Sequence, residues 1–301
     1  MNMKTNIVNK VRALAKGFSP FYLFTLLPLF TACSNDDYLG GHYIEDGAGT
    51  QMNITATIQA ETNPSLAWQE GDIIGISTGY GAYDATARNR GYICQQDGST
   101  FIQTDGNAMY VKGATNITAY YPYIGSDGAE PAITLDTRNQ HNITDYLFAK
   151  AEGVTPANGS KVNLVFDYAL ARLQMTFTVP QGETIKSCRL TGFAQQATVD
   201  PYTLNATLNA PEDLVVTGNN ITSLSLKLIP QTIEATPAVP AQLILVGSIR
   251  SYTIDMSNIT FTGGELRQAT VDVTSGVGTL EFVPTGAPWS DSGVGGNTSS
   301  N

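Results

Sequence analysis

The stretch MNITATIQA, residues 52–60, decides the fold class of this chain. Apolar Ile54, Ala56 and Ile58 alternate with polar residues, which is the period of a strand with one buried face. The same alternation returns in ITSLSLKLI (221–229) and RQATVDVT (267–274). No long stretch places apolar residues at helical spacing. The sequence therefore predicts an all-β protein, with residues 52–60 as its first strand.

Turn signals refine this prediction. Two Asp-Gly pairs, at 97–98 and 105–106, separate short apolar runs. Because Asp-Gly is the favoured pair in tight hairpins, we predict a meander from Gly91 to Lys112. Residues 161–179 are rich in Val, Thr and aromatic side chains, so we expect two strands with a bend at residues 167–169.

The first 32 residues have the pattern of a signal peptide. A basic segment contains Lys4, Lys10, Arg12 and Lys16. The apolar run that follows is shorter than the roughly 20 residues that span a membrane. Thr31 and Ala32 before Cys33 resemble the lipobox of bacterial lipoproteins, in which the signal is cut before a cysteine that then carries lipid. The alternative is a plain secretory signal with Cys33 as a free thiol, and in both cases the protein leaves the cytoplasm.

An acidic stretch follows the cysteine. Ser34, Asn35, Asp36 and Asp37 resemble the export signal that sends Bacteroidetes lipoproteins to the outside of the outer membrane. A solvated acidic linker is the compatible alternative. Residues 33–51 are therefore expected to form a lipidated tether, which reaches at most about 60 Å when fully extended.

Length and charge limit the function. Removal of 32 residues from 301 leaves 269, which suits two domains. The mature chain keeps 12 basic against 26 acidic side chains, so it would repel phosphate backbones and nucleic-acid binding is disfavoured. Cys94 and Cys188 fall in different expected domains, and we interpret them as two lone buried thiols.

The domain boundary is placed at AEGVTPANGS (151–160), where Gly, Pro and Asn gather. The predicted organisation is a signal peptide (1–32), a tether (33–51), an N-terminal β-sandwich domain (52–155), a C-terminal β-sandwich domain (156–284) and a polar tail (285–301).

Motifs for catalysis and metal binding are lacking in the sequence. The chain has 2 histidines, and it contains no HExxH, CxxC, GxSxG or phosphate-binding glycine loop. The aspartates between the apolar runs, among them Asp136 and Asp145, are interpreted as turn or solvated-loop residues. The sequence therefore offers little material for catalysis or for a metal site.

Five segments, in order, are similar to the fimbrillin family of Bacteroidetes, the lipoprotein-derived pilins. They are AWQEGDIIGI (67–76), AYYPY (119–123), DYLFAKAEGV (145–154), VNLVFDYALARLQMTF (162–177) and LKLIPQT (226–232). The resemblance implies two tandem transthyretin-like β-sandwich domains, a fimbrial or adhesive role with no enzymatic activity, no metal and no cofactor, and a place at the outer membrane surface.

The resemblance also implies assembly by strand exchange with other fimbrial subunits, in which a neighbour fills the groove that a missing strand leaves. Ile54, Ala56 and Ile58 are the candidate residues of the exchanged strand. Family subunits are commonly cut after an Arg or Lys near this strand, and this chain has neither between Cys33 and Arg88. We therefore expect an anchor or minor component that keeps its lipid and first strand.

An alternative function is glycan binding by a surface lipoprotein, because exposed tyrosines can form a carbohydrate platform. Tyr120, Tyr121 and Tyr123 form the densest cluster, for which core packing is the competing interpretation. A host or bacterial surface ligand is a further expected partner under either hypothesis.

Overall fold

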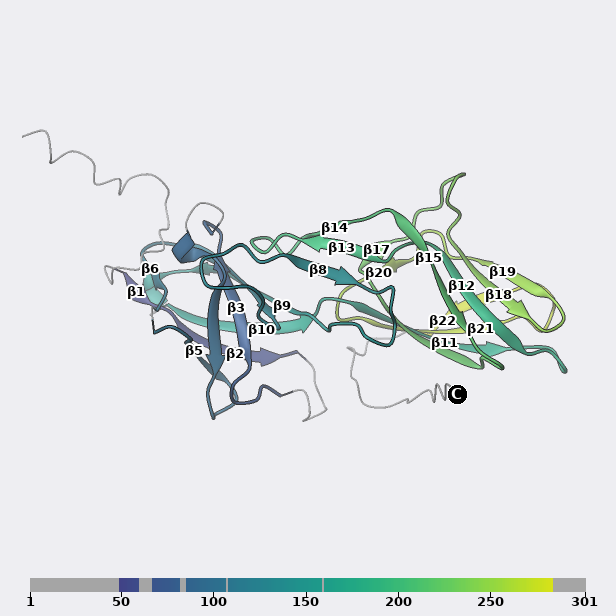
Figure 1. The fold of residues 1–301 in the computed structure, drawn as a ribbon, viewed down its shortest axis with the longest axis horizontal. Helices are drawn as coiled ribbons and strands as arrows, with labels where there is room; N and C mark the ends of the chain where they lie inside the picture. The colour runs from purple at the N-terminus through teal and green to yellow at the C-terminus, as the bar shows by residue number, and fades with distance from the viewer. Residues whose placement is uncertain (1–48, 60–66, 82–84, 107, 159, 284–301) are drawn as a thin grey trace, which may run out of the picture. The chain divides into compact units, whose positions relative to one another are not determined.

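Figure 1 shows the fold of a computed structural model of the chain, which describes residues 49–59, 67–81, 85–106, 108–158 and 160–283. Apart from two short 3-10 helices, η3 (Ala85–Ala87) and η4 (Pro156–Asn158), the regular elements of these residues are strands. The prediction of an all-β protein is confirmed. The described residues belong to one compact unit, residues 41–301, and they build two separate hydrophobic cores.

The first core is enclosed by seven strands whose hydrogen-bonded ladder closes on itself. In the order of their pairing, the strands are β10 (Lys161–Tyr168), β2 (Asn53–Ile58), β5 (Thr100–Gln103), β4 (Arg90–Cys94), β3 (Ile73–Thr78), β7 (Thr115–Tyr121) and β9 (Leu147–Val154). β2 and β10 run parallel, and the other neighbouring pairs are antiparallel. Because every strand has a neighbour on both sides, this ladder has no open edge.

The alternation of residues 52–60 explains how β2 sits in this ladder. Ile54 and Ala56 are buried, whereas Asn53, Thr55 and Thr57 are exposed. On β10, the same period buries Val162, Leu164 and Phe166. The register runs from Lys161 opposite Asn53 to Phe166 opposite Ile58. The two strands therefore present their apolar side chains to the same core.

Trp68 packs into this core from the segment before β3. Its ring makes edge-to-face contacts, at centroid distances of 5.4, 5.3 and 5.1 Å, with Phe101, Tyr121 and Phe166. The next turn is held by the Asp72 carboxylate, which accepts a hydrogen bond from the Gln69 backbone at 2.8 Å. Gly71 takes a φ of 95° there, which glycine adopts without strain.

The second core lies between two four-stranded sheets. One sheet has the order β16 (Ser223–Leu228), β11 (Ala171–Thr178), β21 (Leu266–Asp272) and β22 (Thr279–Phe282). The other has the order β15 (Pro211–Thr217), β12 (Ile185–Ala194), β18 (Gln242–Gly247) and β19 (Ser251–Asp255). This is the architecture of a β-sandwich, in which each sheet has two edge strands among the described residues.

Three smaller sheets complete the described fold. They are β1 (Thr50–Gln51) with β6 (Tyr110–Val111), β14 (Ala206–Leu208) with β13 (Gln196–Val199) and β8 (Ile133–Asp136), and β17 (Gln231–Thr232) with β20 (Thr260–Phe261). Ile133 and Leu135 of β8, and Ala197 and Val199 of β13, belong to the first core. The β14-β13-β8 sheet therefore covers part of that core.

The predicted meander of residues 91–112 is correct only in its first hairpin. β4 and β5 pair antiparallel around the Asp97-Gly98 turn. β6 pairs with β1 and not with β5, so the second hairpin was wrongly predicted. The physical reason is that the backbone of Met109 accepts a hydrogen bond from Met52 at 2.8 Å, which draws the chain after Asp105-Gly106 toward the first strand.

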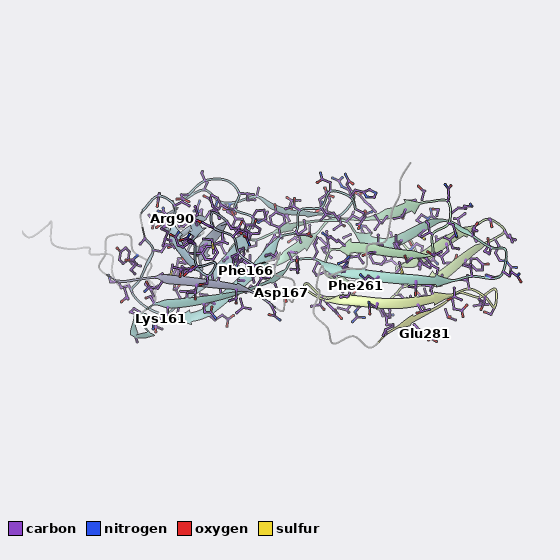
Figure 2. All side chains as sticks on the ribbon, turned by 90° about the horizontal axis from the view of Figure 1, so that it is seen from below. Arg90, Lys161, Phe166, Asp167, Phe261 and Glu281 are labelled. Atoms are coloured by element: carbon purple, nitrogen blue, oxygen red, sulfur yellow. The ribbon has the colours of Figure 1, made fainter. Side chains whose placement is uncertain are left out.

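The apolar run at residues 161–179 forms two strands, as predicted. β10 ends at Tyr168, β11 begins at Ala171, and the chain bends at residues 169–170. β10 pairs in the closed ladder around the first core, and β11 pairs in the sandwich around the second core. In Figure 2, Phe166 marks the first core and Phe261 the second. The change of sheet thus falls after the predicted boundary at residue 155, and the division into two domains stays a prediction.

Candidate functional site

The predicted membrane-attachment residues lie outside the described residues. These are Cys33, with its lipid, and the export signal Ser34, Asn35, Asp36 and Asp37. The polar tail at 285–301 lies outside them as well. The structure therefore leaves their roles as predictions.

The structure brings the three strand-exchange candidates together on one face of β2. Ile54 and Ala56 are 2% and 1% exposed, and Ile58 packs against the same core while half-buried. Beside them lie Val162, Leu164 and Phe166 on β10. If β2 left the ladder, these apolar groups would face water, at a cost of about 25 cal/mol for each Å² of apolar surface.

The backbone of β2 is hydrogen-bonded along both edges. β10 covers one edge, where Gln59 also donates to the Phe166 carbonyl at 2.7 Å. β5 covers the other edge, where Ala56 donates to the Ser99 carbonyl at 2.9 Å. Removal of β2 would therefore leave unpaired peptide groups on two strands, and an extended segment of another chain could satisfy both.

The tyrosine cluster packs into the first core. Tyr120 is buried, and its hydroxyl donates to the Asn89 side chain at 2.6 Å. Burial raises the pKa of Tyr120 to about 12. Tyr121 and Tyr123 are half-buried, and their hydroxyls bind Asp72 and Asp127 at 3.1 and 2.9 Å. Core packing is therefore the interpretation that the geometry favours over a carbohydrate platform.

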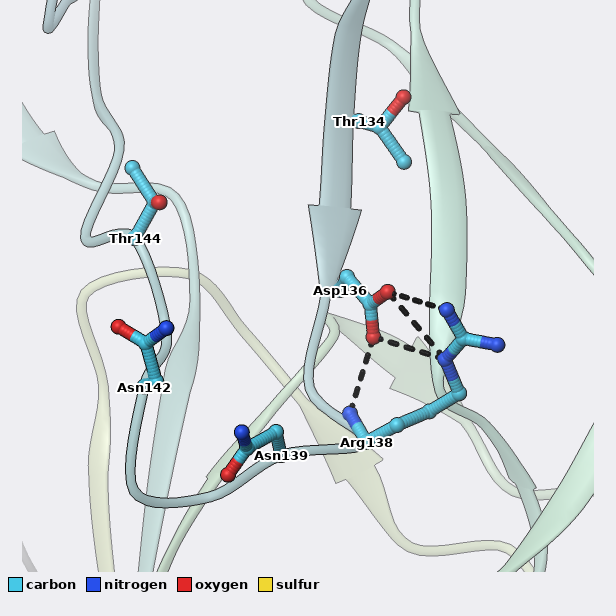
Figure 3. Close-up of a pocket in the computed structure, with 6 residues that line it drawn as sticks. All are labelled: Thr134, Asp136, Arg138, Asn139, Asn142 and Thr144. Carbon is cyan, nitrogen blue, oxygen red and sulfur yellow. Dashed lines mark hydrogen bonds and ion pairs between the residues drawn. The ribbon is translucent and has the colours of Figure 1, made fainter.

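A polar pocket of about 570 Å³ lies beside β8. Its lining residues, drawn in Figure 3, are Thr134, Asp136, Arg138, Asn139, Asn142 and Thr144. Hydroxyl and amide groups dominate, and the two charged residues pair with each other. The pocket therefore offers hydrogen bonds rather than a net charge to a ligand.

The Asp136 carboxylate is the electrostatic centre of this pocket. It accepts hydrogen bonds from the Arg138 guanidinium at 2.6 to 3.2 Å, from the Arg138 backbone at 3.1 Å and from the Gln196 amide at 2.9 Å. The Arg138 side chain is the main cause that lowers the pKa of Asp136 to about 2. The carboxylate is thus ionised and already satisfied at neutral pH.

Groups suited to catalysis are dispersed in the described part of the chain. No group of three or more His, Cys, Asp or Glu side chains there is placed to hold a metal ion. Cys94 and Cys188 are free and buried, as expected, and burial raises the pKa of Cys188 to about 12. A separate finding is that no helix among these residues is long and apolar enough to cross a membrane.

The sequence did not predict the pocket. Asp136 was interpreted as a turn residue, and the polar run from Asp136 to Asn142 had no recognised motif. The available signal was an alternating apolar segment, AITLD, directly followed by amide side chains. Such a signal is weak, because exposed loops commonly have the same composition.

Comparison with known proteins identifies the family. A family model described as fimbrillin-like matches residues 55–289. A candidate cell adhesion protein from Bacteroides ovatus is 20% identical, with 80% of this chain and 98% of that chain covered and a TM-score of 0.53. Another from Bacteroides uniformis is 20% identical, with 77% and 96% covered and a TM-score of 0.52.

At this level of identity the two solved structures support a shared fold and nothing further. No curated protein gives a significant match to the chain. The family model, in contrast, covers most of the chain, including β2 from Thr55, most of the first core, the second core and residues beyond β22. The chain belongs to the fimbrillin-like family.

Proposed function

We propose that this chain is a fimbrial subunit that is anchored by lipid on Cys33 at the cell surface and joined to other subunits by strand exchange through β2. The observation that carries the proposal is the place of β2. It is the first strand of a closed ladder, it supplies apolar side chains to the core, and it is bonded along both edges.

Strand exchange at this position has a physical basis. The groove that β2 fills has a floor of buried apolar residues and two edges of peptide groups. A strand from a neighbouring subunit would gain both the apolar burial and the backbone ladder, with Ile54 and Ile58 setting the register. The same chemistry stabilises the subunit alone and would join it to a partner.

The position in the fimbrium is proposed from the sequence before β2. No Lys or Arg occurs between Cys33 and Arg88, so a trypsin-like protease has no site at which to release the first strand. A subunit that keeps its lipid and its first strand can end a filament at the membrane. We therefore place the chain as an anchor or minor component, with Asp36 and Asp37 in the export signal.

The test combines cell fractionation with electron microscopy. Cells that carry the parent chain, Cys33→Ser, or Asp36→Lys with Asp37→Lys are compared. We expect immunogold label at the base of surface filaments for the parent, loss of membrane attachment for Cys33→Ser, and membrane attachment without surface display for the double variant. The proposal would be rejected if the parent and Cys33→Ser attached equally to membranes, or if no gold label of the parent coincided with surface filaments.

A further inference from the structure

The outer edge of β8 presents peptide groups to the polar pocket. β8 pairs only with β13, so among the described residues no strand covers its other edge. The Thr137 backbone donates to the Gln195 carbonyl at 2.9 Å. In an antiparallel strand, the backbone N–H and C=O groups of successive residues point to opposite edges. The peptide groups of Leu135 therefore also face β13, whereas those of Thr134 and Asp136 face away from it.

The chain returns past this edge and forms the second wall of a slot. After β8 it turns through residues 137–141, and Asn142 and Thr144 then lie across the pocket from Thr134, as Figure 3 shows. Their amide and hydroxyl groups are exposed, and Ile143 between them packs against the first core. An extended segment in this slot would meet hydrogen-bonding groups on both sides.

The second wall is fixed before any ligand arrives. The Gln140 side chain exchanges two hydrogen bonds with the Lys227 backbone, at 2.9 and 3.0 Å. The Lys227 ammonium pairs with Asp145, and Ala169 donates to the Tyr146 carbonyl at 2.8 Å. These contacts hold the segment on both sides of Asn142 and Thr144. A ligand would therefore not have to order the loop, which lowers the cost of binding.

We propose that this slot binds an extended, uncharged segment of a partner polypeptide by strand addition to β8. Thr134 and Asp136 would exchange backbone hydrogen bonds with it, while Asn142 and Thr144 bind its opposite edge. A neutral segment fits because Asp136 and Arg138 neutralise each other. A sugar fits less well, since the Asp136 carboxylate is already occupied by Arg138 and Gln196 and none of the described lining residues is aromatic.

This site is separate from β2, which pairs with β10 and β5. It therefore does not rest on the proposed exchange of the first strand. The two ideas can also fail separately, because variants at Thr134 leave β2 and its neighbours unchanged.

The probe is the capped peptide Thr-Val-Thr-Val-Thr, and amide hydrogen exchange of the whole mature chain is the readout. Without peptide, the amides of Thr134 and Asp136 should exchange fast, while that of Leu135 is protected. Peptide in the millimolar range should protect Thr134 and Asp136. An N-methylated form of the peptide should not, because it lacks the amide donors.

Two substitutions at one position separate backbone from side-chain binding. Thr134→Pro removes only an N–H that points away from β13, so the strand should fold, and we expect binding to weaken roughly tenfold. Thr134→Val keeps the backbone donor and should bind as the parent does. The proposal is overturned if the peptide protects neither amide, if Thr134→Pro binds as well as Thr134→Val, or if N-acetylglucosamine alone protects the same amides.

Discussion

The two cores of the molecule are enclosed in different ways. The first lies inside a ladder of seven strands that closes on itself, and the second lies between two open sheets of four strands. Each contains one long parallel pair, β2 with β10 and β11 with β21. In the sandwich, however, β22 pairs with β21 and is an edge strand of its sheet among the described residues.

This difference separates two ways for another chain to join the molecule. A partner strand can add to an edge such as β22 without displacing anything, since one side of that strand has no neighbour among the described residues. Entry into the first ladder requires a strand to leave, because both sides of every strand are occupied. Strand exchange at β2 would therefore be slow and durable, and addition at an edge fast and reversible.

The sharpest way to break this comparison is to remove one strand from each core. Deletion of residues 52–60 removes β2, and replacement of residues 278–283 by a Gly-Ser linker removes β22. We expect the first change to cause association or loss of the folded first core, because it opens the ladder. The second should leave a folded monomer, because Leu280 and Phe282 are only half-buried. Analytical ultracentrifugation and thermal melting report both results.

A peptide control links the first result to the groove. The peptide MNITATIQA should restore the monomer of the deletion variant, whereas the same peptide with Ile54→Asp and Ile58→Asp should not, because buried carboxylates are too costly. If the deletion variant stays monomeric with an unchanged melting temperature, residues 52–60 contribute nothing to the first core and belong to the tether.

A smaller effect is expected from one buried phenylalanine in each core. Phe166 is 0% exposed in the first core, and Phe261 is 1% exposed in the second. Substitution of either by Ala should lower the free energy of unfolding by about 3–5 kcal/mol, through lost burial and the cavity left behind. Hydrogen exchange resolves which core each variant affects.

The matched pair also tests whether the two cores are independent. We expect Phe166→Ala to raise exchange mainly in the strands of the first ladder, and Phe261→Ala mainly in the sandwich. If either variant raises exchange equally in both cores, the cores unfold as one cooperative unit, and the two-domain prediction is wrong.

The smallest predicted effect concerns how pH changes the stabilisation contributed by one surface turn beside each core. Hydrogen bonds from the Thr100 side chain, then from the Thr100 and Ser99 backbones, lower the pKa of Asp97 to about 2. In the sandwich, Thr274 lowers the pKa of Asp272 in the same way. Since the folded pKa lies below the unfolded value of about 3.9, the stabilisation is present above pH 4 and is lost as the pH falls toward 2.

Asp97→Asn should therefore lower the melting temperature slightly at pH 7 and leave it unchanged near pH 2. Asp272→Asn is the control in the other core and should act on the sandwich alone. A loss of stability in Asp97→Asn that is the same at both pH values would show that the turn depends on shape and not on charge.

Much of the fold could be predicted because strand residues alternate with period two. Ile54 and Ala56 of β2, and Val162, Leu164 and Phe166 of β10, alternate in the sequence and are buried in the structure. The bend between β10 and β11 was likewise indicated by composition. Such local signals set which residues form strands and which side chains point inward.

Pairing partners could not be predicted in the same way. β2 lies beside β10, more than 100 residues later, and an alternating pattern does not state which strand comes next to it. The wrong pairing of β6 has the same origin, since Asp105-Gly106 indicates a turn but not the strand to which the chain returns. The pocket beside β8 also depends on long-range contacts. Gln195 bonds the end of β8, and Lys227 bonds Gln140 in the segment that forms the opposite wall.

The parallel pairing of β2 and β10 has a mechanical consequence. A pull on the chain before Asn53, opposed by a pull on the chain after Tyr168, would act on opposite ends of the ladder that joins residues 53–58 to residues 161–166. Such a load shears all the bonds of the ladder at once, whereas a hairpin pulled at its open end yields one bond at a time. β11 and β21 would be loaded in the same geometry, between Arg172 and Asp272. Each core thus has one ladder oriented to bear tension along the strands, so under load its lifetime would be set by a slow rate of unfolding rather than by its equilibrium stability.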